Sequence, residues 1–104
     1  MIIYEAMLEL PGVYLVTNGD QTRTIFDALR LGGTFEGALL TREREPDAPN
    51  YTPRISAMLD LRVKSPQIAL NILQANQVNP NLTDHTTWRP ALPPAGLGYC
   101  ITTY

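Results

Sequence analysis

The side chains best suited to chemistry lie in residues 41–56, which hold three arginines, three carboxylates and three prolines. Guanidinium groups bind oxyanions in a bidentate manner, and carboxylates take up and return protons. Each proline fixes its own φ and favours an extended residue before it, so helix is excluded and Glu45, Ala48 and Thr52 are predicted to be extended. The pattern is typical of a stiff polar ligand site, and equally of a solvated connector whose charges face water and pair locally.

Length and composition limit the elements that must position this run. The chain has 104 residues, of which 44% are hydrophobic and 17% charged, so we expect one globular domain at most. Seven arginines stand against one lysine, which favours specific anion contacts over general solubility. The net charge of −2 and the dispersed basic residues predict no binding to nucleic acid or membrane.

Cysteine and histidine each occur once, as Cys100 and His85, so neither an intrachain disulfide nor a metal cluster is expected. A thiol dyad of these two residues stays open, although a lone cysteine in a strand is more often a core residue. No apolar run approaches the length of a membrane helix, and the N-terminus has no signal-peptide layout. A cytoplasmic location is therefore predicted.

The first half of the chain predicts two strands and two helices. We expect strands over residues 2–10 and 13–18, the second of them inside the sheet, then a helix over 21–31 and a second helix from the N-cap Thr34 to about residue 43. Gly19 provides a tight turn, and Asn18 or Asp20 is the expected cap of the first helix. The helical period places Gln21 on the polar side of that helix, and it makes Arg42 point inward or into a cleft at the end of an apolar stripe, with a snorkelling side chain as the alternative.

The second half predicts an antiparallel hairpin and a last strand. Residues 54–64 alternate between an apolar and a polar face, residues 67–73 form the partner strand, residues 74–94 form a long loop and residues 96–104 form a strand. The predicted fold class is α+β, with an antiparallel or mixed sheet that two helices cover on one side.

Three stretches carry a family resemblance. They read Val-Thr-Asn-Gly-Asp-Gln-Thr at 16–22, Glu-Pro-Asp-Ala-Pro-Asn-Tyr-Thr-Pro-Arg-Ile-Ser at 45–56 and Gly-Leu-Gly-Tyr-Cys-Ile at 96–101. In these residues, and in the segments 34–36 and 38–43 between them, the chain resembles the archaeal-type inosine monophosphate (IMP) cyclohydrolase family and its bacterial relatives.

The resemblance implies an Ntn-hydrolase-like fold of αββα layers, without an N-terminal nucleophile. It implies ring closure of formamidoimidazole carboxamide ribotide to IMP with loss of water, the last step of purine synthesis, and no metal or cofactor. The chain is shorter than the resemblance leads us to expect, and it has Thr102 where the family tends to have histidine. We therefore expect residues 1–104 to be a single, incomplete domain whose uncovered apolar sheet face makes it a homo-oligomer.

The reaction needs a proton acceptor and a group that stabilises the oxyanion, and the residues that match the family suggest both. Glu45 or Asp47 is the expected general base, with Tyr51 and Arg54 as the other catalytic residues. Substrate binding is assigned to Asn18, Asp20, Arg42, Asn50 and Thr52. Asp20 has the alternative role of a plain helix cap, and Arg44 is expected to be solvated.

Two other function classes stay open at this point. The chain could be a noncatalytic purine-nucleotide-binding module that keeps the arginine and proline run, or a structural association domain. A purine ribonucleotide is the expected substrate of the cyclohydrolase and the expected ligand of the binding module.

Overall fold

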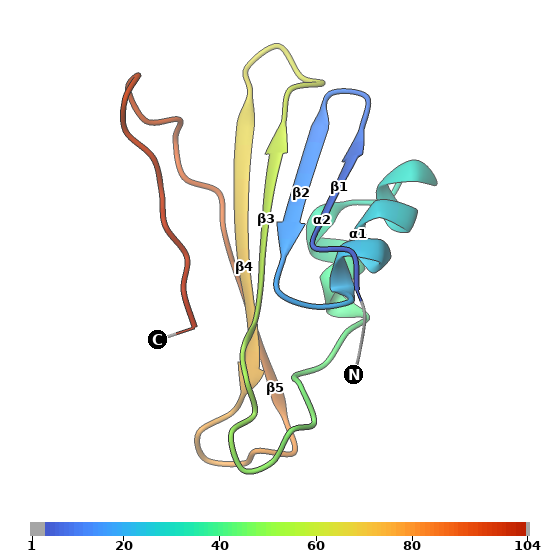
Figure 1. Ribbon diagram of the computed structural model, residues 1–104, viewed down its shortest axis with the longest axis vertical. Coiled ribbons are helices and arrows are strands. Elements are labelled where there is room, and N and C mark those ends of the chain that lie inside the picture. Colours follow the sequence, from blue (N-terminus) through green and yellow to red (C-terminus); the bar gives the residue numbers. More distant parts are fainter. Residues whose placement is uncertain (1–3, 104) are drawn as a thin grey trace.

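The computed structural model describes residues 4–103, which form one antiparallel sheet with two helices on one of its faces (Figure 1). The five strands pair in sequence order, and the α+β prediction is confirmed. The elements are β1 (Met7–Leu10), β2 (Val13–Thr17), α1 (Gln21–Arg30), α2 (Phe35–Leu40), β3 (Arg54–Asp60), β4 (Gln67–Ala75) and β5 (Thr83–Trp88).

The first hairpin places β2 in the interior of the sheet, as predicted. Gly12 has a φ of +80°, which a glycine adopts without steric cost, and this lets Leu10 pair with Val13 across a two-residue turn. The strand predicted over residues 2–10 begins only at Met7, and residues 2 and 3 lie outside the described part of the chain.

Helix α1 differs from the predicted amphipathic pattern at its first residue. Ile25 and Leu29 are buried as expected, but Gln21, predicted on the polar side, has 0% exposure. The helix starts directly under the end of β2, so its first side chain lies against β3 instead of water. Asp20 occupies the N-cap position without a side-chain capping hydrogen bond, so the prediction that it caps the helix is wrong.

Helix α2 begins where predicted and ends early. The Thr34 hydroxyl accepts a hydrogen bond from the Gly37 amide at 2.9 Å, which confirms Thr34 as the N-cap. The helix ends at Leu40 instead of residue 43, so Arg42 lies after the helix and not at the end of its apolar stripe.

The core lies between the helices and the inner face of the sheet. It contains Val13, Leu15, Ile25, Leu29, Phe35, Ala38, Leu39, Met58, Ala69 and Leu73. The alternation predicted for residues 54–64 is confirmed over β3, but the strand ends at Asp60. Its apolar side, Ile55, Ala57 and Leu59, is half-buried, while the side that begins with Arg54 faces the helices. The sheet therefore presents apolar residues on both faces, and the helices cover only one.

The last third of the chain departs most from prediction. The predicted loop 74–94 contains β5, a largely polar strand that pairs with β4 at Asn71↔Thr87 and Leu73↔His85. The predicted strand 96–104 is wrong for residues 96–103, which belong to no strand of the sheet, and Tyr104 lies outside the described residues. This segment runs along the face of the sheet opposite the helices (Figure 1).

Candidate functional site

A cavity of about 260 Å³ lies where β2 ends, α1 begins and the loop of residues 41–53, here called the proline loop, joins β3. Segments distant in sequence meet there because β2 and β3 are neighbours that pair at Thr17↔Ser56. The cavity is lined by Tyr4, Asn18, Gly19, Asp20, Glu45, Pro46 and Arg54. Four of these residues, Asn18, Asp20, Glu45 and Arg54, were predicted to belong to the site.

Arg54 is the central cation of this cavity. It is the first residue of β3, on the side of the strand that faces the helices, and its side chain is only 10% exposed. Its Nε donates to the Glu43 carbonyl at 3.0 Å, while its Nη1 lies 2.7 Å from Asp20 Oδ1 and 3.2 Å from Glu45 Oε1. Both cavity carboxylates thus share one guanidinium nitrogen, and within the described residues no hydrogen bond engages Nη2.

Asp20 links Arg54 to a second arginine. Its Oδ1 atom also accepts a hydrogen bond from Arg42 Nη2 at 2.6 Å. Burial raises the pKa of the Asp20 carboxyl, but hydrogen bonds and positive charge from Arg42 and Arg54 outweigh burial and lower the pKa below its ordinary value. Asp20 is therefore ionised at neutral pH.

Arg42 faces inward, as the sequence predicted, although it is not helical. Its side chain is 22% exposed, and Nη1 donates to the Thr24 hydroxyl at 2.7 Å. With Asp20, Glu45 and Arg54 it makes a cluster of two carboxylates and two guanidiniums whose formal charges cancel.

Asn18 lines the cavity, but its amide already holds the backbone. The Asn18 Oδ1 atom accepts the Ile55 amide at 2.9 Å, and Nδ2 donates to the Pro53 carbonyl at 2.9 Å. The side chain thereby ties the end of β2 to the start of β3, beside the cavity.

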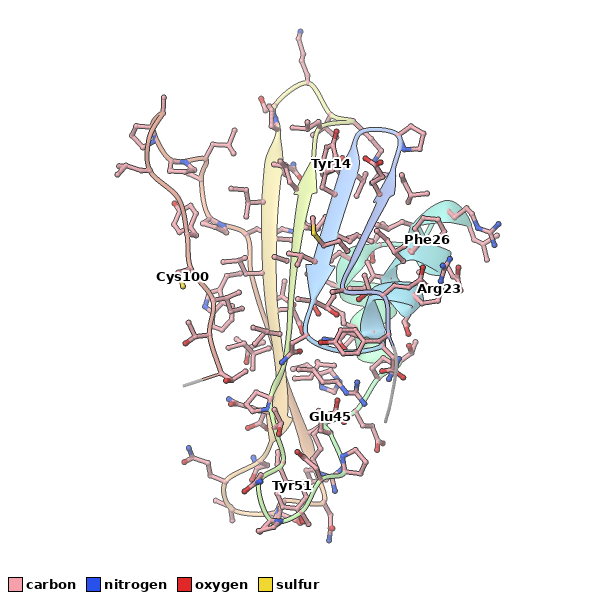
Figure 2. The ribbon with its side chains drawn as sticks, viewed as in Figure 1. Tyr14, Arg23, Phe26, Glu45, Tyr51 and Cys100 are labelled. Carbon is pink, nitrogen blue, oxygen red and sulfur yellow. The ribbon has the colours of Figure 1, made fainter. Side chains whose placement is uncertain are left out.

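The other predicted site residues lie towards the far end of the proline loop. Tyr51 has a φ of +44°, and Figure 2 shows it at the tip of the loop, apart from Glu45. Asp47 accepts hydrogen bonds from the Thr52 amide at 2.7 Å and from the Thr52 hydroxyl, and the hydroxyl is the largest cause of its lowered pKa. The Asn50 amide donates to the Asp47 carbonyl at 3.0 Å. None of these four residues lines the cavity.

Arg44 was predicted to be solvated, and this is wrong. Its side chain is 14% exposed, its Nε donates to the Pro80 carbonyl, and its guanidinium lies 5.3 Å from the centre of the Tyr51 ring. The Arg44 amide also donates to the Thr83 hydroxyl at 3.0 Å. Arg44 therefore anchors the proline loop to the connection between β4 and β5.

The single histidine and cysteine are far from forming a dyad. His85 Nε2 lies 2.9 Å from the Arg42 carbonyl, and its pairing with Leu73 places it on the helix side of the sheet. Cys100 lies in the C-terminal segment on the opposite side and is exposed, so the expectation of a core cysteine is also wrong (Figure 2).

Sequence reasoning missed two residues near the site, Tyr4 and Gln21. Tyr4 lines the cavity from the segment before β1, and its type and position gave no indication of this. Gln21 is buried behind the cavity and accepts a hydrogen bond from Arg54 Nη1 at 3.4 Å. Its position near Asn18 and Asp20, just after the end of an interior strand, was the feature of the sequence that could have indicated a place near the site.

Residues 4–103 contain no group of three or more histidine, cysteine, aspartate or glutamate side chains placed to hold a metal ion. In the same part of the chain, neither helix has the length and apolar character needed to cross a membrane.

The fold and the cavity define an α+β protein with a charge-balanced, arginine-rich polar site at the junction of two central strands. Comparison with protein families gives a match over residues 1–104 to the family described as IMP cyclohydrolase-like protein, and the chain belongs to this family. This confirms the family that the sequence resembles. Neither the curated proteins nor the solved structures gave a match.

Proposed function

We propose that this chain is an IMP cyclohydrolase that closes the ring of formamidoimidazole carboxamide ribotide with loss of water, in purine biosynthesis. The observation that carries the proposal is the placement of Glu45 Oε1 3.2 Å from Arg54 Nη1 in the wall of a cavity. Family membership supports the same reaction.

Ring closure forms a bond between the carboxamide nitrogen and the formyl carbon, while the formyl oxygen gains negative charge. Glu45 is the proposed general base for the carboxamide proton, because its side chain is 30% exposed at the cavity wall and so can reach a ligand. The guanidinium of Arg54 stabilises the oxyanion through a charge-assisted hydrogen bond. Protonated Glu45 then returns this proton to the oxyanion, which becomes a hydroxyl group. Glu45 next takes up the proton of the formamide nitrogen and passes it to the hydroxyl group, which leaves as water while the C=N bond of the new ring forms.

The charge and size of the cavity favour the base end of the nucleotide over its phosphate. The two carboxylates of the cluster already neutralise Arg42 and Arg54, so a dianionic phosphate would have to displace one of them. The cavity volume of about 260 Å³ is below the roughly 300–1,000 Å³ of pockets that enclose whole ligands. We propose that the imidazole ring with its formamide and carboxamide groups lies here, and that Asn18 and Asp20 border its ribose.

We further propose that residues 1–104 form one incomplete domain of an Ntn-hydrolase-like αββα arrangement. The support is the outer face of the sheet, where Tyr14, Val16 and Trp88 are each exposed by about 45%. A second sheet packed on this face would bury them, as sheets do in sandwiches.

The first experiment is a spectrophotometric assay of ring closure with the purified chain at high concentration. Glu45→Gln is expected to lower the rate roughly 10²–10⁴-fold, because it removes the proton acceptor and keeps the side-chain shape. Glu43→Gln is the matched control, since Glu43 is 81% exposed and, within residues 4–103, its carboxylate pairs with Arg44 alone, at 4.0 Å.

A folded parent chain that closes no ring would contradict the proposed activity. Calorimetry with IMP then separates the alternatives: binding without closure identifies a nucleotide-binding module, and no binding leaves a structural association domain. Equal rates for the parent and Glu45→Gln would remove Glu45 as the base while keeping the activity.

A further inference from the structure

Gln21 is a polar side chain with 0% exposure, which is unusual for glutamine at the first turn of a helix. A polar group is buried at a cost unless it makes hydrogen bonds, so the partners of Gln21 explain why it is there.

The Gln21 amide joins two residues of the cavity to the strand beside them. Its Oε1 accepts a hydrogen bond from Arg54 Nη1 at 3.4 Å, and its Nε2 lies 3.4 Å from Asn18 Oδ1. The same nitrogen also lies 3.1 Å from the Ile55 carbonyl and 3.3 Å from the Ser56 hydroxyl. One side chain therefore contacts the central arginine, the loop before α1 and the start of β3.

Most of these partners would remain hydrogen-bonded without Gln21. The Ile55 carbonyl also accepts the Asn18 amide at 3.2 Å, and Asn18 Oδ1 accepts the Ile55 amide at 2.9 Å. Arg54 Nη1 retains the Asp20 carboxylate at 2.7 Å. Within the described residues, Gln21 is the side chain that bridges Asn18 Oδ1 and the guanidinium of Arg54.

Gly19 leaves the space that this bridge occupies. A Cβ atom at position 19 would collide with Gln21 Oε1 and approach Arg54 Nη1 to 3.2 Å. The chain turns at residues 18–20 as predicted, but Gly19 is not among the glycines with positive φ. At this position the site therefore needs the space that glycine leaves and not its backbone freedom. The absence of a side chain at Gly19 therefore allows the Gln21 amide to reach Arg54.

We propose that Gln21 is a positioning residue, which orients the Arg54 guanidinium for the proposed reaction through a bridge that Gly19 makes room for. This inference rests on the proposed function. Because a misplacement of about 1 Å can cost roughly 100-fold in rate, loss of the bridge is expected to lower kcat 10- to 100-fold with a smaller change in KM.

The test compares the full chain with Gln21→Met, which keeps side-chain length but removes the amide, and with Gly19→Ala, which displaces the bridge without removing any hydrogen-bonding group. Ring closure gives kcat and KM. The NMR signal of the Arg54 Nε–H, assigned by its loss in Arg54→Lys, reports the orientation of the guanidinium whether or not the chain is active. Thr34→Ala, which removes the cap of α2, is the control for a plain loss of stability.

Lower kcat together with a shifted Arg54 signal in both variants, with Thr34→Ala unchanged in both readouts, supports the proposal. An unchanged kcat in folded Gln21→Met overturns it and leaves the proposed function intact. If the parent chain closes no ring, the proposed function fails, and the Arg54 signal then decides: a shift in Gln21→Met keeps Gln21 as the residue that orients Arg54, and no shift removes it. If Gln21→Met does not fold, Gly19→Ala gives the same decision.

Discussion

Asp20 Oδ1 lies 2.7 Å from Arg54 Nη1, although 34 positions separate the two residues in the sequence. The contact joins the N-terminus of α1 to the start of β3, and it takes the Asp20 side chain away from the helix cap that its position offers. A capping hydrogen bond stabilises a helix by about 1 kcal/mol. The Asp20 side chain does not make this bond and contacts two arginines instead. That choice favours a role for Asp20 in the cavity.

Replacement of Asp20 by asparagine is expected to make stability less dependent on pH. The pKa of the folded carboxyl is lowered from 3.8, so the ionised form contributes stability that is present above pH 3.8 and disappears as pH falls through the lowered folded value. Because the side chain is 55% exposed, we expect a loss of at most about 1 kcal/mol at pH 7. Urea unfolding of Asp20→Asn and of the parent chain at pH 7 and below pH 3 measures the difference.

The control for this prediction is Asp27→Asn, which removes an exposed carboxylate of α1 whose nearest arginine nitrogen is 3.8 Å away. If the difference in free energy of unfolding between Asp20→Asn and the parent stays constant down to the lowest pH, the ionisation of Asp20 does not contribute to stability and the prediction is wrong.

The local elements were predictable from sequence because local rules determine them. The turn at Gly12, the N-cap at Thr34 and the alternation of β3 each follow from residue type and spacing over a few positions. The convergence of Asp20, Glu45 and Arg54 was predicted from a family resemblance, because pattern alone does not show that β2 and β3 are neighbours.

The failures of prediction depend on long-range contacts. Strand β5 is mostly polar, so its sequence has no apolar period that predicts a strand. It forms because its backbone pairs with the edge of β4. Gln21 and Arg44 look solvated in a helical or charge pattern, yet tertiary contacts bury both side chains. The segment 97–103 has the composition of a strand, but none of its residues belongs to a strand of the sheet.

Arg54→Lys is expected to be a damaging change despite the retained charge. A single ammonium group does not reach the Glu43 carbonyl, Asp20 and Glu45 together as the planar guanidinium does. We expect a loss of about 1.5–3 kcal/mol in the free energy of unfolding, the range for hydrogen bonds to charged groups, and a large loss of ring closure. Arg62→Lys is the control, because Arg62 is 43% exposed and, in the part of the chain that the structure describes, forms an ion pair with Asp60 alone. Equal unfolding curves for the two variants would contradict the central role of Arg54.

The two candidate bases should separate cleanly by mutation. Glu45 lines the cavity, whereas Asp47 holds the Thr52 amide and hydroxyl at the other side of the loop. Glu45→Gln is therefore expected to abolish most ring closure, and Asp47→Asn to reduce it less than about 10-fold, below the loss that a missing general base gives. Steady-state kinetics of both variants decides this, and a greater loss in Asp47→Asn would transfer the role of base to Asp47.

The outer face of the sheet is expected to bind a second copy of the chain. Met7, Tyr14, Val16 and Trp88 are exposed on the side that the helices leave uncovered, and large contiguous apolar surfaces are rare on monomers. A charge buried in such a contact is costly, so Val16→Lys should raise the dissociation constant of the dimer by at least about tenfold, or 1.4 kcal/mol. Leu31→Lys is the matched control, since Leu31 is an exposed leucine that follows α1. Sedimentation velocity over a range of concentrations measures both, and a parent chain that stays monomeric at high concentration would exclude this association.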